Sequence, residues 1–272
     1  MPATLVKTPN FDQQAAQYDT ATPIQSAAAL LLAEQIAKTA KFGGRWLDVG
    51  CGTGKLSVAV LQQQSNRHIT GVNSITPMFD ELIGVDRAAA MLSHWQTKCE
   101  TYRHFFAPCE ASEWQLRPIL ADMTALPLPE SCTDGIMSSF ALHWVTPDVL
   151  VELARVLKPN GQLHLAIPVA GSLSAVAQRF PKLPIYPFLA ENDWQTQLDA
   201  LVANHHGYYL YQFTQEFSHE YANLKSLLHG LKQMGGAVAA QPAIETATLR
   251  TYLKDDAAVL LNYRLLIVGV QL

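Results

Sequence analysis

The stretch Arg45-Trp-Leu-Asp-Val-Gly-Cys-Gly-Thr-Gly-Lys55 carries the strongest signal in this chain of 272 residues. Residues 45–50 are a short apolar run that ends at a glycine, which is typical of a buried β-strand. Glycines recur at positions 52 and 54, and a helix is predicted over 54–64. Because glycines let the backbone approach a ligand closely, and the N–H groups at a helix start suit an anionic group, this stretch predicts a ligand-binding turn.

The spacing of the glycines distinguishes between two classes of cofactor. Enzymes that bind dinucleotides use G-x-G-x-x-G to hold a pyrophosphate, whereas this chain reads G-x-G-x-G and has Lys55 where the third dinucleotide glycine would fall. Asp48 stands two residues before the first glycine and suits a cationic ligand better than a diphosphate. An NAD-dependent oxidoreductase is therefore disfavoured, and an ordinary glycine-rich turn is the plainer alternative.

This spacing resembles the first motif of the class I S-adenosylmethionine-dependent methyltransferases. The resemblance implies an α/β, Rossmann-like fold with a mostly parallel seven-stranded sheet, helices on both faces and lid helices. It implies that the glycine turn receives the amino acid part of S-adenosylmethionine. Two further acids are expected in chain order, one for the ribose hydroxyls and one for the adenine. The predicted cofactor residues of the turn itself are Asp48, Gly50, Cys51, Gly52 and Gly54.

Asp86 is the predicted ribose-binding acid. It ends the strand predicted over 81–86 and precedes an alanine-rich helical segment, so it lies at a strand-to-helix junction. Asn73 lies nearer to the usual separation of about 20 residues from the glycines, but it is not an acid. Choosing Asp86 implies that about a dozen residues are inserted between positions 64 and 81.

Asp122 is the predicted adenine-binding acid, because it ends the strand predicted over 118–122. Met123 would add a backbone N–H and an apolar wall, and Arg87 and Phe140 complete the predicted cofactor residues. For both Asp86 and Asp122 the plainer alternative is a capping residue without a ligand. Three motifs in the expected order are more specific than any one of them, and no metal ion is expected.

Strands alternate with helices through most of the chain, which indicates an α/β fold with a parallel sheet. Helices are predicted over residues 11–40 with a break near Pro23, and over 54–64, 88–96 and 147–157. Strands are predicted over residues 45–50, 69–72, 81–86, 118–122, 134–140, 162–168, 208–218 and 262–270. We expect a single methyltransferase domain over residues 1–272, with an amino-terminal helical lid (1–40), a cofactor-binding core (41–168) and a substrate lid with the final strands (169–272).

The composition excludes several other classes of protein. Charged residues make up 15% of the chain and hydrophobic residues 49%, a balance that opposes intrinsic disorder. The net charge of −4 gives no sign of a broad basic surface for nucleic acid. No signal peptide and no run of about 18 apolar residues is found, and the spacing of the four cysteines fits neither a zinc ribbon nor a disulfide framework. We therefore expect a cytoplasmic protein that does not bind a membrane.

Several segments are also similar to the malonyl-acyl-carrier-protein methyltransferases of biotin synthesis. The similarity covers nearly the whole chain and includes segments outside the cofactor motifs. These segments are Phe11-Asp-Gln-Gln-Ala-Ala-Gln-Tyr18-Asp with Gln25, Ser139-Phe-Ala-Leu-His143-Trp144, Pro168-Val-Ala-Gly-Ser-Leu173, Leu227-Leu-His-Gly-Leu-Lys-Gln-Met-Gly-Gly236 and Asn262-Tyr-Arg-Leu-Leu-Ile-Val-Gly269.

This resemblance implies methylation of the free carboxylate of malonyl-acyl-carrier protein, with malonyl-coenzyme A as the alternative acyl carrier. Tyr18 would lie on the lid over the cofactor, and His143 and Trp144 would line the acyl pocket. A carboxylate has a reference pKa near 4, so it needs no general base, and the enzyme only has to position it and exclude water. Three cations are candidates for pairing with this carboxylate: Arg179, Lys182 and Arg264.

Other functions are compatible with the same core motifs. The acceptor of the methyl group could be another small-molecule carboxylate, an amine or a quinone carbon, and a non-catalytic binding module could keep the fold. From residue 171 onward the chain has seven basic and eight acidic residues. No basic cluster for docking an acidic carrier protein therefore stands out in the sequence.

Overall fold

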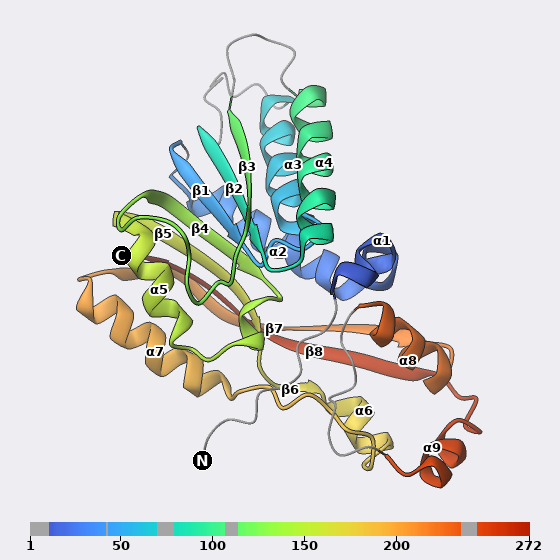
Figure 1. Cartoon of the computed structure of the whole chain (residues 1–272). Helices are drawn as coiled ribbons and strands as arrows, with labels where there is room; N and C mark the ends of the chain where they lie inside the picture. Colours follow the sequence, from blue (N-terminus) through green and yellow to red (C-terminus); the bar gives the residue numbers. More distant parts are fainter. Residues whose placement is uncertain (1–10, 42, 70–78, 107–113, 235–243) are drawn as a thin grey trace.

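A computed structural model describes residues 11–41, 43–69, 79–106, 114–234 and 244–272. A seven-stranded sheet with the order β3-β2-β1-β4-β5-β8-β7 forms its centre (Figure 1). The strands β1 to β5 are parallel, and β8 runs antiparallel to both β5 and β7. The strands are β1 (Arg45–Val49), β2 (Glu81–Asp86), β3 (Gln115–Leu120), β4 (Thr133–Ser139), β5 (Leu157–Pro168), β7 (Tyr208–Tyr221) and β8 (Val259–Gln271), and β6 (Ala170–Leu173) is a short additional strand. The predicted fold class is confirmed.

Helices cover both faces of the sheet, and each face has its own apolar core beneath the helices (Figure 1). Trp46 of β1 belongs to the core beneath α2, α3 and α4, whereas its neighbour Leu47 belongs to the core beneath α5 and α7. A parallel strand buried on both faces explains why Trp46, Leu47 and Val49 are all apolar, although they do not all point to the same face. The helices are α1 (Phe11–Ala21), α2 (Pro23–Thr39), α3 (Lys55–Ile69), α4 (Ala89–Phe106), α5 (Val149–Val156), α6 (Ser174–Arg179), α7 (Glu191–Asn204), α8 (Leu224–Gln233) and α9 (Thr246–Tyr252), with a 3-10 turn at Leu142–Trp144.

The predicted elements agree with the structure at most positions and differ in length. The strand predicted over 81–86 is β2 itself, and the break near Pro23 separates α1 from α2. The last two strands are longer than predicted, because β7 and β8 pair as a long antiparallel ladder with one irregularity between Tyr209 and Tyr211. The helix predicted over 54–64 continues to Ile69, so the strand predicted over 69–72 fails at its first residue, and residues 70–72 lie outside the described part of the chain.

The amino-terminal helices belong to different environments. Leu32 and Ile36 of α2 are fully buried in the core that α3 also covers, whereas α1 contacts α4 and α8. The boundary predicted at residue 40 between lid and core therefore groups a core helix with a covering helix, and the division into three segments stays a prediction. Among the described helices, none is both long and apolar enough to cross a membrane.

Candidate active site

The glycine turn after β1 has a backbone that only glycine adopts easily. Gly50, Gly52 and Gly54 have φ angles of +66°, +51° and +90°, a region that residues with a Cβ enter at a cost of about 1–2 kcal/mol. A Cβ on Gly50 would lie 2.2 Å from the Cβ of Ala141, so this position is also sterically closed. The N–H groups of Gly50 and Cys51 donate to the carbonyl of Val85, which ties the turn to β2.

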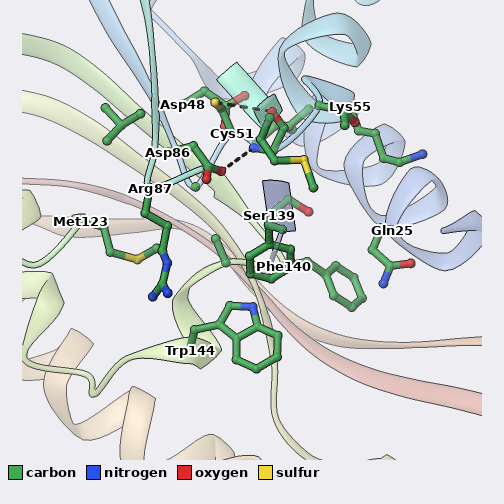
Figure 2. A pocket seen from close by; sticks show the side chains of 18 of the residues that line it. Gln25, Asp48, Cys51, Lys55, Asp86, Arg87, Met123, Ser139, Phe140 and Trp144 are labelled. Atoms are coloured by element: carbon green, nitrogen blue, oxygen red, sulfur yellow. Dashed lines mark hydrogen bonds between the residues drawn. The ribbon is translucent and has the colours of Figure 1, made fainter. Parts of the chain in front are cut away.

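A cavity opens in front of this turn at the carboxyl ends of the parallel strands (Figure 2). It encloses about 970 Å³ of space free of atoms, open solvent at its mouth included. Nine of the ten predicted cofactor residues line it, and the tenth, Gly54, packs against Trp95 instead. The nine are Asp48, Gly50, Cys51, Gly52, Asp86, Arg87, Asp122, Met123 and Phe140. Residues far apart in the chain thus meet at the edge where open α/β sheets bind ligands.

Asp86 connects the glycine turn to the start of α4. Its Oδ2 accepts a hydrogen bond of 2.9 Å from the N–H of Gly52, and its Oδ1 accepts one of 2.9 Å from the N–H of Ala88. Burial raises the pKa of this carboxyl. An ionised carboxylate offers about four acceptor sites, so it keeps capacity to accept from a ribose hydroxyl. The alternative residue, Asn73, lies outside the described residues.

Asp48 is buried beneath the turn and accepts a hydrogen bond of 2.6 Å from Ser57 Oγ. Ser57 Oγ in turn accepts a hydrogen bond from Trp95 Nε1, which anchors the acid to α4. Burial raises the pKa of Asp48 to about 7, and the negative charge of Asp86 adds to this shift. A cationic ligand group nearby would favour the ionised form. The buried charge therefore fits the ammonium group of an amino acid.

Asp122 is more exposed and is partly used by its own turn. Its Oδ1 accepts hydrogen bonds from both the N–H and the hydroxyl of Thr124, at 2.9 and 2.7 Å. These bonds lower the pKa of the carboxyl. Both reach the same oxygen, so Oδ2 keeps its capacity to accept a hydrogen bond. The next residue, Met123, also lines the cavity (Figure 2).

Two polar atoms in the cavity wall are buried without a partner in the described part of the chain, namely Gln25 Oε1 and Ser139 Oγ. Unpaired buried polar atoms are uncommon in folded proteins and call for an explanation. A ligand with hydrogen-bond donors beside them would supply one. Neither residue was predicted as a site residue. Gln25 lies on α2, and only the family resemblance of its segment signalled it.

A polar cluster from α1 also closes over the turn. Asp19 accepts a hydrogen bond of 2.5 Å from Thr53 Oγ1 and forms an ion pair with Lys98, while Lys55 Nζ donates to Ser26 Oγ at 2.6 Å. Burial alone would raise the pKa of Asp19, but the hydrogen bonds from Lys98 and Thr53 lower it below the usual value. The partners of Asp19 lie 34 and 79 residues away in the chain, which is why sequence spacing did not reveal them.

The predicted substrate residues lie in two adjoining places. Tyr18 and Trp144 line the first cavity, and His143 lines a second, smaller cavity that Trp144 also borders. Burial raises the pKa of Tyr18 and lowers that of His143 to about 3, so both side chains are uncharged at neutral pH. Phe140, between them and the turn, has a φ angle of +57°, a strained conformation that is common at functional sites.

The three cations proposed for the acceptor carboxylate do not line either of these cavities. Arg179 is paired with Asp255 at 2.6 Å, and Arg264 is paired with Glu191 at 3.0 Å. Among the described residues of the first cavity wall, the basic side chains are those of Lys55 and Arg87. Sequence reasoning could not choose among cations because their ion partners come from distant segments.

The sheet order, the glycine turn after β1 and the acids at the ends of successive strands define a class I methyltransferase. The sequence profile of the family described as methyltransferase domain matches residues 47–165. The protein is therefore a methyltransferase that uses S-adenosylmethionine as its cofactor.

Two curated relatives match the chain well beyond residues 47–165. The malonyl-[acyl-carrier protein] O-methyltransferase of Alcanivorax borkumensis is 28% identical over 237 residues, which cover 83% of this chain and 69% of the relative. The protein of the same name from Xylella fastidiosa is 26% identical and covers 91% of this chain and 77% of its own. Among solved structures, the YcgJ protein of Bacillus subtilis has the same fold with a TM-score of 0.54 at 15% identity, over 89% of this chain and 97% of its own.

Proposed function

We propose that this enzyme methylates the free carboxylate of a malonyl thioester carried on acyl carrier protein, an early step of biotin synthesis. The observation that carries the proposal is the extent of the similarity. Two relatives named malonyl-[acyl-carrier protein] O-methyltransferase match 83% and 91% of the chain, well beyond the shared methyltransferase segment of residues 47–165. The chain thus resembles them in the segments outside the cofactor motifs too.

The chemistry of the site supports an acceptor that is already nucleophilic. S-adenosylmethionine, when bound, supplies a methyl group on a positively charged sulfur. A carboxylate with a reference pKa near 4 is ionised at pH 7 and attacks without losing a proton. The new bond joins the carboxylate oxygen to the methyl carbon as the carbon–sulfur bond breaks, and the sulfur keeps the electron pair. The chain then has to align the acceptor and exclude water.

The titratable residues of the first cavity agree with this requirement. Asp48 accepts a hydrogen bond from Ser57 of α3, and Asp86 accepts one from Gly52 of the glycine turn. Tyr18 stays protonated because burial raises its pKa, so it can donate a hydrogen bond but cannot serve as a base at neutral pH. Positioning without proton transfer is the role that these groups support.

The test is transfer of labelled methyl from S-adenosylmethionine to malonyl-acyl-carrier protein, with malonyl-coenzyme A and the unacylated carrier protein as parallel acceptors. We expect base-labile label, as in a methyl ester, on the malonyl carrier and none on the unacylated carrier. Equal transfer to malonyl-coenzyme A would remove the carrier protein as partner. Absence of transfer to either thioester, with the cofactor still bound, would contradict the proposal and redirect it to other small carboxylates, amines or quinone carbons.

A further inference from the structure

The second cavity lies beside the first and shares Trp144 with it. It encloses about 520 Å³ on the same measure as the first cavity. Its wall comes from the turn after β4, from the segment around β6 and α6, and from α8 and β8. The described residues of that wall are His143, Trp144, Leu173, Val176, Leu183, Pro184, Ile185, Tyr186, Phe188, Leu231 and Tyr263. None of these residues carries a charge at neutral pH.

His143 is held firmly in this wall. Its backbone carbonyl accepts a hydrogen bond of 2.6 Å from the hydroxyl of Tyr186. Its ring lies against three aromatic rings, with centroid distances of 4.6 Å to Trp144, 5.5 Å to Phe188 and 5.6 Å to Tyr186. The ring position is therefore fixed by packing on several sides.

The imidazole of His143 has unused hydrogen-bonding capacity. Its Nδ1 is shielded from solvent and has no hydrogen-bond partner in the described part of the chain. A neutral imidazole has one N–H donor and one acceptor nitrogen. Leaving such groups unpaired and buried is unfavourable, and a bound ligand with a matching polar atom would relieve this. The cavity thus combines an apolar wall with a fixed polar group, the pattern of a small-molecule site.

The uncharged wall restricts which part of the acceptor enters. A carboxylate placed among aromatic rings would lose its hydration without gaining an ion pair, which is strongly unfavourable. The first cavity, by contrast, is lined by charged and polar groups: the N–H groups of the glycine turn, the acids Asp48, Asp86 and Asp122, and the cations Arg87 and Lys55, of which Lys55 is also paired with Asp19 at 3.6 Å. The reacting carboxylate is therefore suited to the first cavity, and an uncharged, partly polar group to the second.

We propose, building on the proposed function, that the second cavity binds the uncharged thioester end of the acceptor, and that His143 donates a hydrogen bond to the thioester carbonyl oxygen. The aromatic wall then provides specificity. Free malonate, which carries a second carboxylate where the thioester would be, would have to bury that charge beside Trp144 and Phe188. The site accordingly selects a monoacid whose other end is masked as a thioester.

The test compares malonyl-N-acetylcysteamine with its carbonyl-free thioether analogue, S-(2-carboxyethyl)-N-acetylcysteamine, as acceptors. The wild-type enzyme should show a kcat/KM about 10-fold higher for the thioester, the size expected for one hydrogen bond to a fixed donor. In His143→Phe, which keeps a ring but has no N–H, this ratio should fall to near 1. His143→Asn or His143→Gln, which retain an N–H donor, should restore part of the ratio. Free malonate should be at least 100-fold poorer than the thioester with the wild-type enzyme.

The outcomes separate the two proposals. If the wild-type enzyme methylates no malonyl thioester, the proposed function fails and this inference fails with it. If it methylates the thioester but His143→Phe keeps the wild-type ratio, only the role of His143 is overturned. Comparable rates with free malonate and the thioester overturn the role of the uncharged wall, a result that needs no variant to fold. Binding of S-adenosylmethionine to each variant, measured by calorimetry, confirms that the first cavity is intact.

Discussion

The first cavity and the second share Trp144 but are built from different kinds of interaction. The first is organised by backbone and carboxylate hydrogen bonds around Gly52 and Asp86, and its residues follow the ends of successive parallel strands. The second is a packed group of aromatic rings in which His143 has an unpaired nitrogen. Backbone and carboxylate hydrogen bonds fix the positions of ligand atoms accurately, whereas apolar packing sets the shape of a cavity and excludes charged groups. We infer that the first cavity determines which cofactor binds and the second determines which acceptor binds.

This difference predicts that the first cavity tolerates change least at Gly50. Gly50→Ala should lower the free energy of unfolding by about 3 kcal/mol, the sum of a left-handed backbone and of overpacking against Ala141. S-adenosylmethionine binding should fall by more than about 100-fold, because the turn must shift to relieve the contact. Denaturant unfolding and titration calorimetry measure the two effects.

Gly52→Ala is the matched control for this prediction. Gly52 has a similar φ angle, but a Cβ there would meet no atom within 4 Å. Only the backbone cost of about 1 kcal/mol should remain. Equal losses of stability in the two variants would show that the contact with Ala141 is not what closes this position.

The two cavities also differ in how far the sequence alone predicts them. Asp86 and Asp122 could be found because Asp86 ends β2 and Asp122 lies just after β3, and a strand followed by a turn is a local pattern. The links from Asp19 to Thr53 and Lys98, and the seating of His143 against Tyr186 and Phe188, join segments that are distant in the chain. No local pattern encodes such packing. The same reason explains why Arg179 and Arg264, plausible cations in the sequence, are instead paired with acids away from the two cavities.

The next largest effect is expected at the acids of the first cavity. Asp86→Ala should weaken binding of S-adenosylmethionine by about 1.5–3 kcal/mol, typical of hydrogen bonds to a charged group. Asp122→Ala should cost less, because Asp122 is more exposed and shares its Oδ1 with Thr124. Calorimetric titration of both variants ranks the two acids. If a folded Asp86→Ala protein binds with unchanged affinity, the ribose contact must be made elsewhere.

A pH-dependent prediction concerns His164, which packs in the core away from both cavities. Its ring is stacked between Trp46 and Tyr211, its Nδ1 lies 2.8 Å from the hydroxyl of Tyr211, and burial lowers its pKa to about 3. In the unfolded chain its pKa is near 6.5. The unfolded state therefore binds a proton that the folded state does not, and stability falls as the pH drops below about 6.5 towards 3.

His164→Phe isolates this contribution from that of other groups. Between pH 7 and pH 5 the wild-type protein should lose about 2 kcal/mol of unfolding free energy relative to this variant, from about 1.4 kcal/mol per pH unit. His143 shifts in the same direction in both proteins. Asp48, whose pKa is raised to about 7, acts in the opposite direction, since its stabilising contribution is lost as the pH rises. The contributions of His143 and Asp48 are the same in both proteins, so they cancel when the two free energies of unfolding are subtracted. Urea unfolding at several pH values measures these free energies. If they depend on pH in the same way in the wild type and the variant, His164 is not buried as described.

The smallest effect is expected from the cluster that holds α1 over the first cavity. Asp19→Asn removes the ion pairs with Lys98 and Lys55 and weakens the bond from Thr53, but the Asp19 side chain is 38% exposed and solvent screens it. The loss of stability should therefore be about 0.5–1 kcal/mol. Because α1 contributes Phe11 and Tyr18 to the cavity wall, release of S-adenosylmethionine should become about threefold faster. Stopped-flow displacement measures this rate.

Lys158→Gln is the matched control, since Lys158 forms an ion pair of similar exposure with Asp134 away from the cavity. It should change stability by a similar amount and leave the release rate unchanged, whereas equal release rates in wild type and Asp19→Asn would mean that α1 does not retain the cofactor.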